Sequence, residues 1–181
     1  MQRTLSIQIG DKEYPLVYTL KVFKSISDKF KSPDGMKAAI ENENAAQAIE
    51  AQIFVLHKLI TAGAELVEFY GEKDAPALTY TELRAMIQLT HIARIKDLIL
   101  STVAVSSQLS IEAAPAKKKT RKSEATFENY MWQALHLGLD YNTALTIPFG
   151  ELLSLISEEA IQNGAKEIIR NNREEAIPDW S

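Results

Sequence analysis

The sequence predicts a mostly α-helical protein that opens with a small β-hairpin and ends, after a flexible linker, in a C-terminal helical module. Three observations predict this class. Strict alternation of apolar and polar residues occurs near the start of the chain, apolar residues three or four positions apart recur through most of the rest, and five basic residues within six positions interrupt the pattern about two-thirds of the way along. With 181 residues, 46% of them hydrophobic, the chain can build a sizeable core.

The hairpin is predicted from residues 5–18. Apolar residues alternate with polar ones on both sides of the turn sequence Gly10-Asp11-Lys12. These apolar positions are Leu5, Ile7, Ile9, Tyr14, Leu16 and Tyr18. Pro15 has no N–H to donate, so the second arm is expected to be short or to lie at an edge. A lone hairpin is marginal in water, and we expect this one to pack on the helices that follow.

Four helices are predicted before the basic run, at residues 20–30, 36–40, 45–70 and 79–109. Thr19 is a suitable N-cap for the first, and Thr79 or Thr81 for the last. The third is apolar on more than one side, which predicts a central position and also self-association or a helical partner. We therefore expect residues 1–107 to form one α+β domain with a hairpin laid on helices.

Charge divides the chain into three parts. Residues 1–107 hold 12 basic and 13 acidic side chains, residues 108–125 hold five and two, and residues 126–181 hold three and nine. The middle part combines Pro, Ala, Ser and Lys and has no aromatic residue, so residues 108–125 are expected to form a flexible basic linker. The last part predicts two further helices, the second beginning near Pro148, and its aromatic residues suggest a docking surface.

The chain shows no catalytic or metal-binding pattern. It has no cysteine, Gly-rich phosphate loop or Gly-x-Ser-x-Gly sequence, and its three histidines, His57, His91 and His136, lie far apart. We therefore expect no catalytic residue, no metal ligand and no cofactor, and interpret the histidines as residues of the surface or core edge. No window is apolar enough to predict a membrane span, and no exported leader is expected.

The basic run Lys117 to Lys122 has three interpretations. It is a solvated linker, a tether for nucleic acid that binds through phosphate charges, or the trace of a slippery messenger sequence. The third follows from Lys117, Lys118 and Lys119, because three lysine codons can spell a run of adenines on which a ribosome shifts frame. No aromatic residue is interleaved to stack on bases, which weighs against the nucleic-acid interpretation.

A helical domain, a lysine run and a distinct helical tail together resemble the tail assembly chaperones of long-tailed bacteriophages. The motif-bearing part is FENYMWQALHLGLDYNTALTIPFGELLSLI, residues 127–156. The residues that match in order are Trp132, Gly138, Leu139, Thr146, Pro148, Phe149, Leu152, Leu153 and Ile156. In this family a short protein and a frameshift-extended form share one N-terminal domain, and this chain resembles the extended form.

The resemblance implies a non-enzymatic chaperone that acts in the host bacterial cytoplasm and is not retained in the mature virion. Its N-terminal domain would coat the tape-measure protein, and its C-terminal module would recruit tail-tube subunits. The residues expected to contact that partner are Phe127, Trp132, Leu135, Phe149, Leu152, Leu153 and Ile156. The alternative is a helical regulator or adaptor that uses the basic run to contact nucleic acid.

Overall fold

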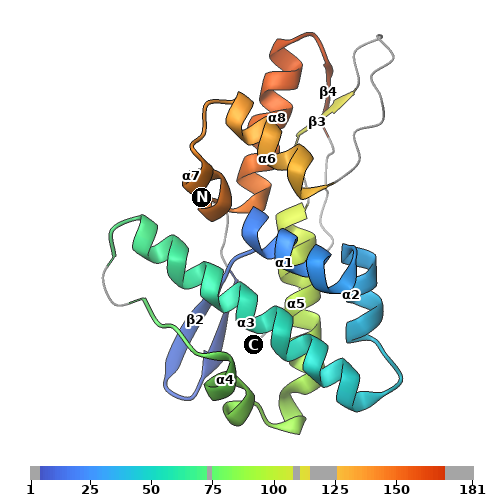
Figure 1. Ribbon diagram of the computed structural model, residues 1–181, viewed down its shortest axis with the longest axis vertical. Coiled ribbons are helices and arrows are strands. Elements are labelled where there is room, and N and C mark those ends of the chain that lie inside the picture. The colour runs from blue at the N-terminus through green and yellow to red at the C-terminus, as the bar shows by residue number, and fades with distance from the viewer. Residues whose placement is uncertain (1–4, 73–74, 108–110, 115–125, 170–181) are drawn as a thin grey trace.

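The computed structural model contains an N-terminal antiparallel hairpin followed by helices, so the predicted fold class is confirmed (Figure 1). The structure describes residues 5–72, 75–107, 111–114 and 126–169. Its elements in chain order are β1 (Leu5–Ile9), β2 (Lys12–Leu16), α1 (Leu20–Phe30), α2 (Pro33–Ile40), α3 (Ala45–Phe69), α4 (Tyr80–Met86), the 3₁₀ turn η1 (Leu89–His91), α5 (Ile92–Ser107), β3 (Ile111–Ala114), α6 (Phe127–His136), α7 (Tyr141–Thr146), α8 (Phe149–Gln162) and β4 (Lys166–Ile169).

The hairpin packs on α3 through an unusually close backbone approach. Gly10 forms the turn with a φ of +65°, a conformation that glycine adopts without strain. On α3, Gly63 lies directly against Pro15, so that a Cβ added there would overlap the Pro15 carbonyl oxygen. The Val17 N–H also donates to the Leu59 carbonyl at 3.2 Å. The hairpin is therefore held against the helix by backbone contact as well as by side chains.

Helix α3 is the centre of the structure, as its sequence predicts. It crosses the middle of the molecule in Figure 1 and packs against β2, α1, α2, α4, α5 and α7. Asn44 caps its N-terminus by accepting from the N–H groups of Ala46 and Gln47. Because different neighbours cover it on several sides, the buried residues, from Ala48 to Leu66, occupy more than a single stripe of the helix.

The single helix predicted for residues 79–109 is wrong, because the chain breaks between α4 and α5. Thr79 caps α4 in a capping box with Glu82, and the helix ends at Ile87, whose backbone is extended. Leu83 on α4 and Ile99 on α5 are both fully buried in the same core. The break redirects the chain so that both apolar stripes reach that core, which a straight helix of this length would not allow.

Part of the predicted linker also differs from expectation. Residues 111–114 form β3, which pairs antiparallel with β4, and Ile111 lies opposite Ile169. This pairing joins segments more than fifty positions apart in the sequence, so no local pattern predicts it. The rest of the predicted linker, including Lys117, Lys118 and Lys119, lies outside the described residues, as do the last residues of the predicted C-terminal module.

The C-terminal segment contains three described helices where two were predicted. Gly138, with a φ of +85°, follows the end of α6, and Asp140 then caps the separate short helix α7. Pro148 is the N-cap of α8 rather than a residue of its first turn. The three helices share one hydrophobic cluster with α1, α3, α5 and the hairpin. Within the described structure they are joined to the N-terminal helices by a continuous core.

Candidate protein-interaction surface

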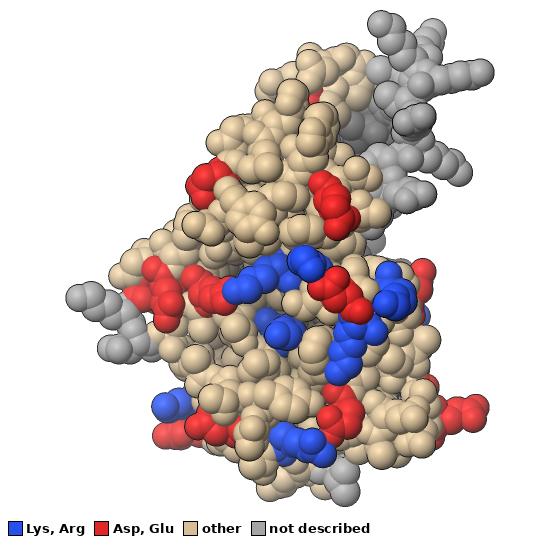
Figure 2. All heavy atoms as spheres, viewed as in Figure 1, with Lys and Arg blue, Asp and Glu red and all other residues tan. Residues whose placement is uncertain are grey.

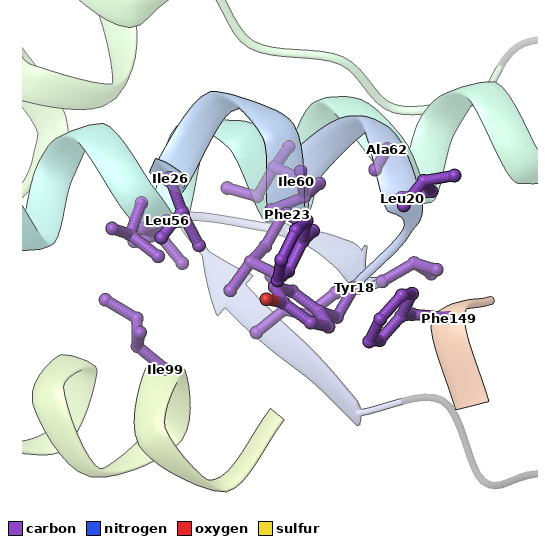
Figure 3. Packing of buried hydrophobic residues seen from close by; sticks show 14 of the residues in the cluster. Tyr18, Leu20, Phe23, Ile26, Leu56, Ile60, Ala62, Ile99 and Phe149 are labelled. Carbon is purple, nitrogen blue, oxygen red and sulfur yellow. The ribbon is translucent and has the colours of Figure 1, made fainter. Parts of the chain in front are cut away.

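The inner side of the C-terminal helices is built around Phe149, the first residue of α8. Its side chain is 4% exposed and lies against three aromatic rings that we call the socket: Tyr18, Phe23 and Tyr130. The ring centroids are 5.5 Å from Tyr18, 5.5 Å from Phe23 and 5.0 Å from Tyr130. Phe23 is stacked on Phe149 and the two tyrosines meet it edge to face, which are favourable aromatic geometries. Figure 3 shows Phe149 beside Tyr18 and Phe23.

The backbone fixes Phe149 in this position. Pro148 has no side-chain donor or acceptor with which to cap α8, and the first N–H groups of a helix have no partner within it. The Phe149 N–H instead donates to the Tyr18 carbonyl at 2.7 Å, and Thr19 forms a bridge with Pro148. Thr19 also caps α1 by accepting from the Val22 N–H at 3.3 Å. The short stretch Tyr18-Thr19 therefore follows the hairpin, caps α1 and pairs with the start of α8.

The socket carries no charge at neutral pH. Burial raises the pKa of Tyr18 well above its ordinary value, with a smaller contribution from Tyr130. Burial likewise raises the pKa of Tyr130. Both phenols therefore stay protonated, and the contact between α8 and the N-terminal part is an apolar, aromatic one.

The outer side of the same helices exposes large apolar side chains. Trp132 is 65% exposed and Leu135 is 48% exposed, both on α6, while Tyr141 at the start of α7 is 52% exposed. The Trp132 indole stacks on His136 with ring centroids 5.3 Å apart and planes 6° from parallel. His136 Nε2 in turn lies 3.7 Å from Glu159 Oε1 on α8. Trp132 is thus an exposed aromatic ring held in a defined orientation.

An open groove of about 420 Å³ lies where α3 ends beside α7. It is lined by Lys21, Glu65, Glu68, Phe69, Asn142, Leu145 and Thr146. Phe69 and the neighbouring Tyr70 are 48% and 64% exposed, and their rings meet edge to face. Its lining combines two apolar side chains, Phe69 and Leu145, with polar and charged ones, of which Lys21 and Glu65 form an ion pair. This mixed lining can contact both sides of an amphipathic helix.

The structure separates the residues that the sequence predicts as partner contacts. Trp132 and Leu135 are at the surface, whereas Phe149 and Leu152 are buried in the core. Buried side chains are not available to a partner in this conformation, and Phe149 instead attaches the C-terminal helices to the socket. The remaining three, Phe127, Leu153 and Ile156, are partly buried against the core, and the Phe127 ring lies under the Lys24 ammonium at 5.6 Å.

Sequence reasoning missed the groove because its lining comes from three helices. Phe69 and Tyr70 extend the apolar pattern of α3 into its last turn, beyond the residues that the hairpin and the other helices cover. An aromatic pair at a helix end followed by Gly71 was the available indication. Nothing local indicated that Leu145 would face Phe69.

The described residues offer little reactive chemistry. No group of three or more His, Cys, Asp or Glu side chains in this part of the chain is placed to hold a metal ion. The Nε2 atom of His57 lies 3.1 Å from the Leu78 carbonyl, to which it donates, and burial lowers the pKa of this imidazole. None of the helices in the described ranges has both the length and the apolar composition to cross a membrane.

Comparisons with protein-family models, with curated proteins and with solved structures give no match to this chain.

Proposed function

We propose that this chain is a non-enzymatic tail assembly chaperone of a phage or prophage, which covers apolar helical stretches of a tape-measure protein and recruits tail-tube subunits. The observation that carries the proposal is the distribution of exposed apolar side chains. Among the described residues, five of the seven exposed large apolar side chains lie at the end of α3 or on α6 and α7, while the aromatic socket is closed. These five are Phe69, Tyr70, Trp132, Leu135 and Tyr141. Such patches are typical of surfaces that bind other proteins.

The two exposed regions suit two partners. The open groove offers Phe69 and Leu145 to the apolar side of a tape-measure helix and charged side chains to its polar side. The outer side of α6 exposes Trp132, one of the two aromatic residues of the stretch that resembles the phage-tail motif. A long apolar helical partner is covered by many copies through modest contacts, and these release in sequence as the tube grows. Self-association of the chain along that partner is part of the proposal.

Co-expression tests this function directly. The full chain is produced with a tape-measure fragment, or with the tail-tube protein, from the same genome, and the soluble complex is measured by sedimentation. Replacing both Phe69 and Tyr70 by Ser should reduce recovery of the tape-measure complex. Trp132→Ala should weaken tail-tube binding by about 2 kcal/mol, as expected for an interface anchor. Met86→Ser, which changes an exposed apolar residue on α4, serves as the matched control.

Variants of the basic run distinguish the nucleic-acid alternative from the chaperone proposal. Replacement of Lys117, Lys118 and Lys119 by Ala should leave both protein complexes nearly intact, because exposed linker charges contribute little to such contacts. On the described surface, a band of lysines runs along α1 in Figure 2, but Lys21 pairs with Glu65 and Lys24 with Asp28. If neither protein binds and DNA binds in a salt-sensitive way that needs the lysines, the chaperone proposal fails.

A further inference from the structure

The outer face of α6 has an unusual combination of charge and aromatic character. We define this face by Glu128, Trp132, Leu135 and His136. Glu128, Trp132 and His136 are four residues apart and therefore lie in line along one side of the helix, with Leu135 beside them. The face thus presents, in order, a carboxylate, an exposed indole and an imidazole.

The Trp132 ring has one side covered by the chain itself and one side open. His136 stacks on one side of the Trp132 ring. Among the described residues, no second ring and no ammonium or guanidinium group lies against the other side. An exposed indole whose orientation is fixed by a stacked neighbour is the best side-chain acceptor for a cation, which sits within about 6 Å of the ring centre.

The surroundings of this face are anionic. From residue 126 to residue 165 the sequence has no Lys or Arg and five acidic residues, Glu128, Asp140, Glu151, Glu158 and Glu159. In Figure 2 the visible surface of these helices is apolar or uncharged with scattered acidic patches, and the basic residues begin only at the N-terminal helices below. Two of these carboxylates, Glu128 on the face and Glu159 beside His136, would attract a cationic partner and repel an anionic one.

One lysine of the chain, Lys24, lies close to the N-terminal end of α6. Lys24 of α1 donates a hydrogen bond to Asp28 at 2.6 Å, which is the main reason that its pKa lies above the ordinary lysine value. Glu128 and Tyr141 raise the same pKa by smaller amounts. Lys24 is thus held at Asp28 and over the Phe127 ring, and the stretch from Glu128 to His136 remains open for a cation from elsewhere.

We infer that the α6 face binds a helical protein segment that presents an arginine beside an apolar side chain. The guanidinium stacks on the open side of Trp132 within reach of the Glu128 carboxylate, and the apolar side chain packs on Leu135. Arginine fits better than lysine because its planar group stacks on aromatic rings and pairs with carboxylates through several N–H donors. The inference deepens the proposed function, since α6 is also the surface assigned there to the tail-tube contact, but it fixes the chemistry of the partner and not its identity.

Binding of designed peptides to the full chain tests the inference. Three amphipathic helical peptides of equal length carry the same Leu residues and differ only in having Arg, Gln or Glu beside them. Affinity is measured by calorimetry, and the Trp132 indole N–H is followed by NMR in a Trp180→Phe background. We expect the Arg peptide to bind roughly three- to tenfold more tightly than the Gln peptide, and the Glu peptide to bind weakest. Raising the salt concentration should reduce the preference.

Variants locate the binding site. Trp132→Leu keeps an apolar side chain but removes the ring, and it should abolish most of the preference for Arg over Gln. Glu128→Lys should shift the preference toward the Glu peptide. Met86→Leu changes an exposed apolar residue on α4, outside both proposed binding surfaces, and should leave the preference unchanged. All three positions are exposed, so circular dichroism should report unchanged helix content.

Three results would overturn the inference: equal affinity for the three peptides, no measurable binding of any of them, or a preference for Arg that survives Trp132→Leu. The outcome is independent of the phage-tail proposal. A chain that binds the Arg peptide but no tail protein refutes the proposed function alone, while one that binds a tail-tube protein through Trp132 without any preference for Arg refutes the inference alone.

Discussion

The inner and outer sides of the C-terminal helices use aromatic residues in opposite ways. Phe149 on the inner side is 4% exposed and meets three rings, whereas Trp132 on the outer side is 65% exposed and meets one imidazole. Both residues belong to the same motif-bearing stretch of the sequence. The comparison teaches that a short helical segment can be rich in aromatic residues for two reasons, attachment to its own chain and presentation to another molecule.

The strongest test of this difference is the loss of each ring. Phe149→Ala should lower the free energy of unfolding by about 3–5 kcal/mol, because it empties a buried aromatic site. Trp132→Ala should change it by no more than about 0.5 kcal/mol, since the ring is mostly in water. Chemical denaturation followed by circular dichroism measures both. Equal costs would mean that the two sides are not distinct in solution.

A second test asks whether the contact between Phe149 and the socket, which we call the inner contact, depends on the hairpin. Gly63→Ala places a methyl group where the Pro15 carbonyl lies, and the forced shift should cost roughly 1–3 kcal/mol. Because Tyr18 and Thr19 lie two and three positions after the end of β2, we also expect the C-terminal helices to be cleaved faster by protease. Gly71→Ala is the control, where no atom lies within 4 Å and only backbone strain of about 1 kcal/mol is expected. Unchanged protection of α6 to α8 in Gly63→Ala would show that the inner contact does not need the hairpin.

The smallest expected effect concerns His57, which lies on neither side of the C-terminal helices. Burial lowers its pKa in the folded chain, so between the folded and unfolded pKa values the unfolded chain binds more protons. The stability contributed by the neutral imidazole is therefore present above about pH 6.5 and is lost as the pH falls toward the folded pKa. Denaturation at several pH values should show a weaker decline for His57→Gln, whose amide still donates to the Leu78 carbonyl.

The pH effect at His57 also tests whether the outer side of the C-terminal helices is independent of the core. The difference between the wild-type chain and His57→Gln should be the same in a Trp132→Ala background, because the two sites share no contact. A pH effect that depends on Trp132 would mean that the outer face is coupled to the core through contacts that the structure does not contain.

Local sequence patterns predict most of the elements and few of the contacts between them. Alternation predicts the hairpin, and apolar spacing with Thr19 predicts α1, because these features depend on residues close together in the chain. The break at Ile87 and the pairing of β3 with β4 depend on the shared core and on a distant strand, so they could not be predicted locally. The same limit applies to Phe149, since its position is decided by Tyr18 and Phe23 at the other end of the sequence.

The residues of the socket and the side chain that covers them are synthesised at different times. Tyr18 and Phe23 leave the ribosome first, and Phe149 follows about 126 residues after Phe23. At a translation rate of 5–20 residues per second, the two N-terminal rings remain without the Phe149 side chain for on the order of 6–25 s. During that interval the nascent protein carries an uncovered aromatic site. A translation product that stopped before α6 would keep this site permanently open, and would differ from the full chain in what it can attract as well as in length.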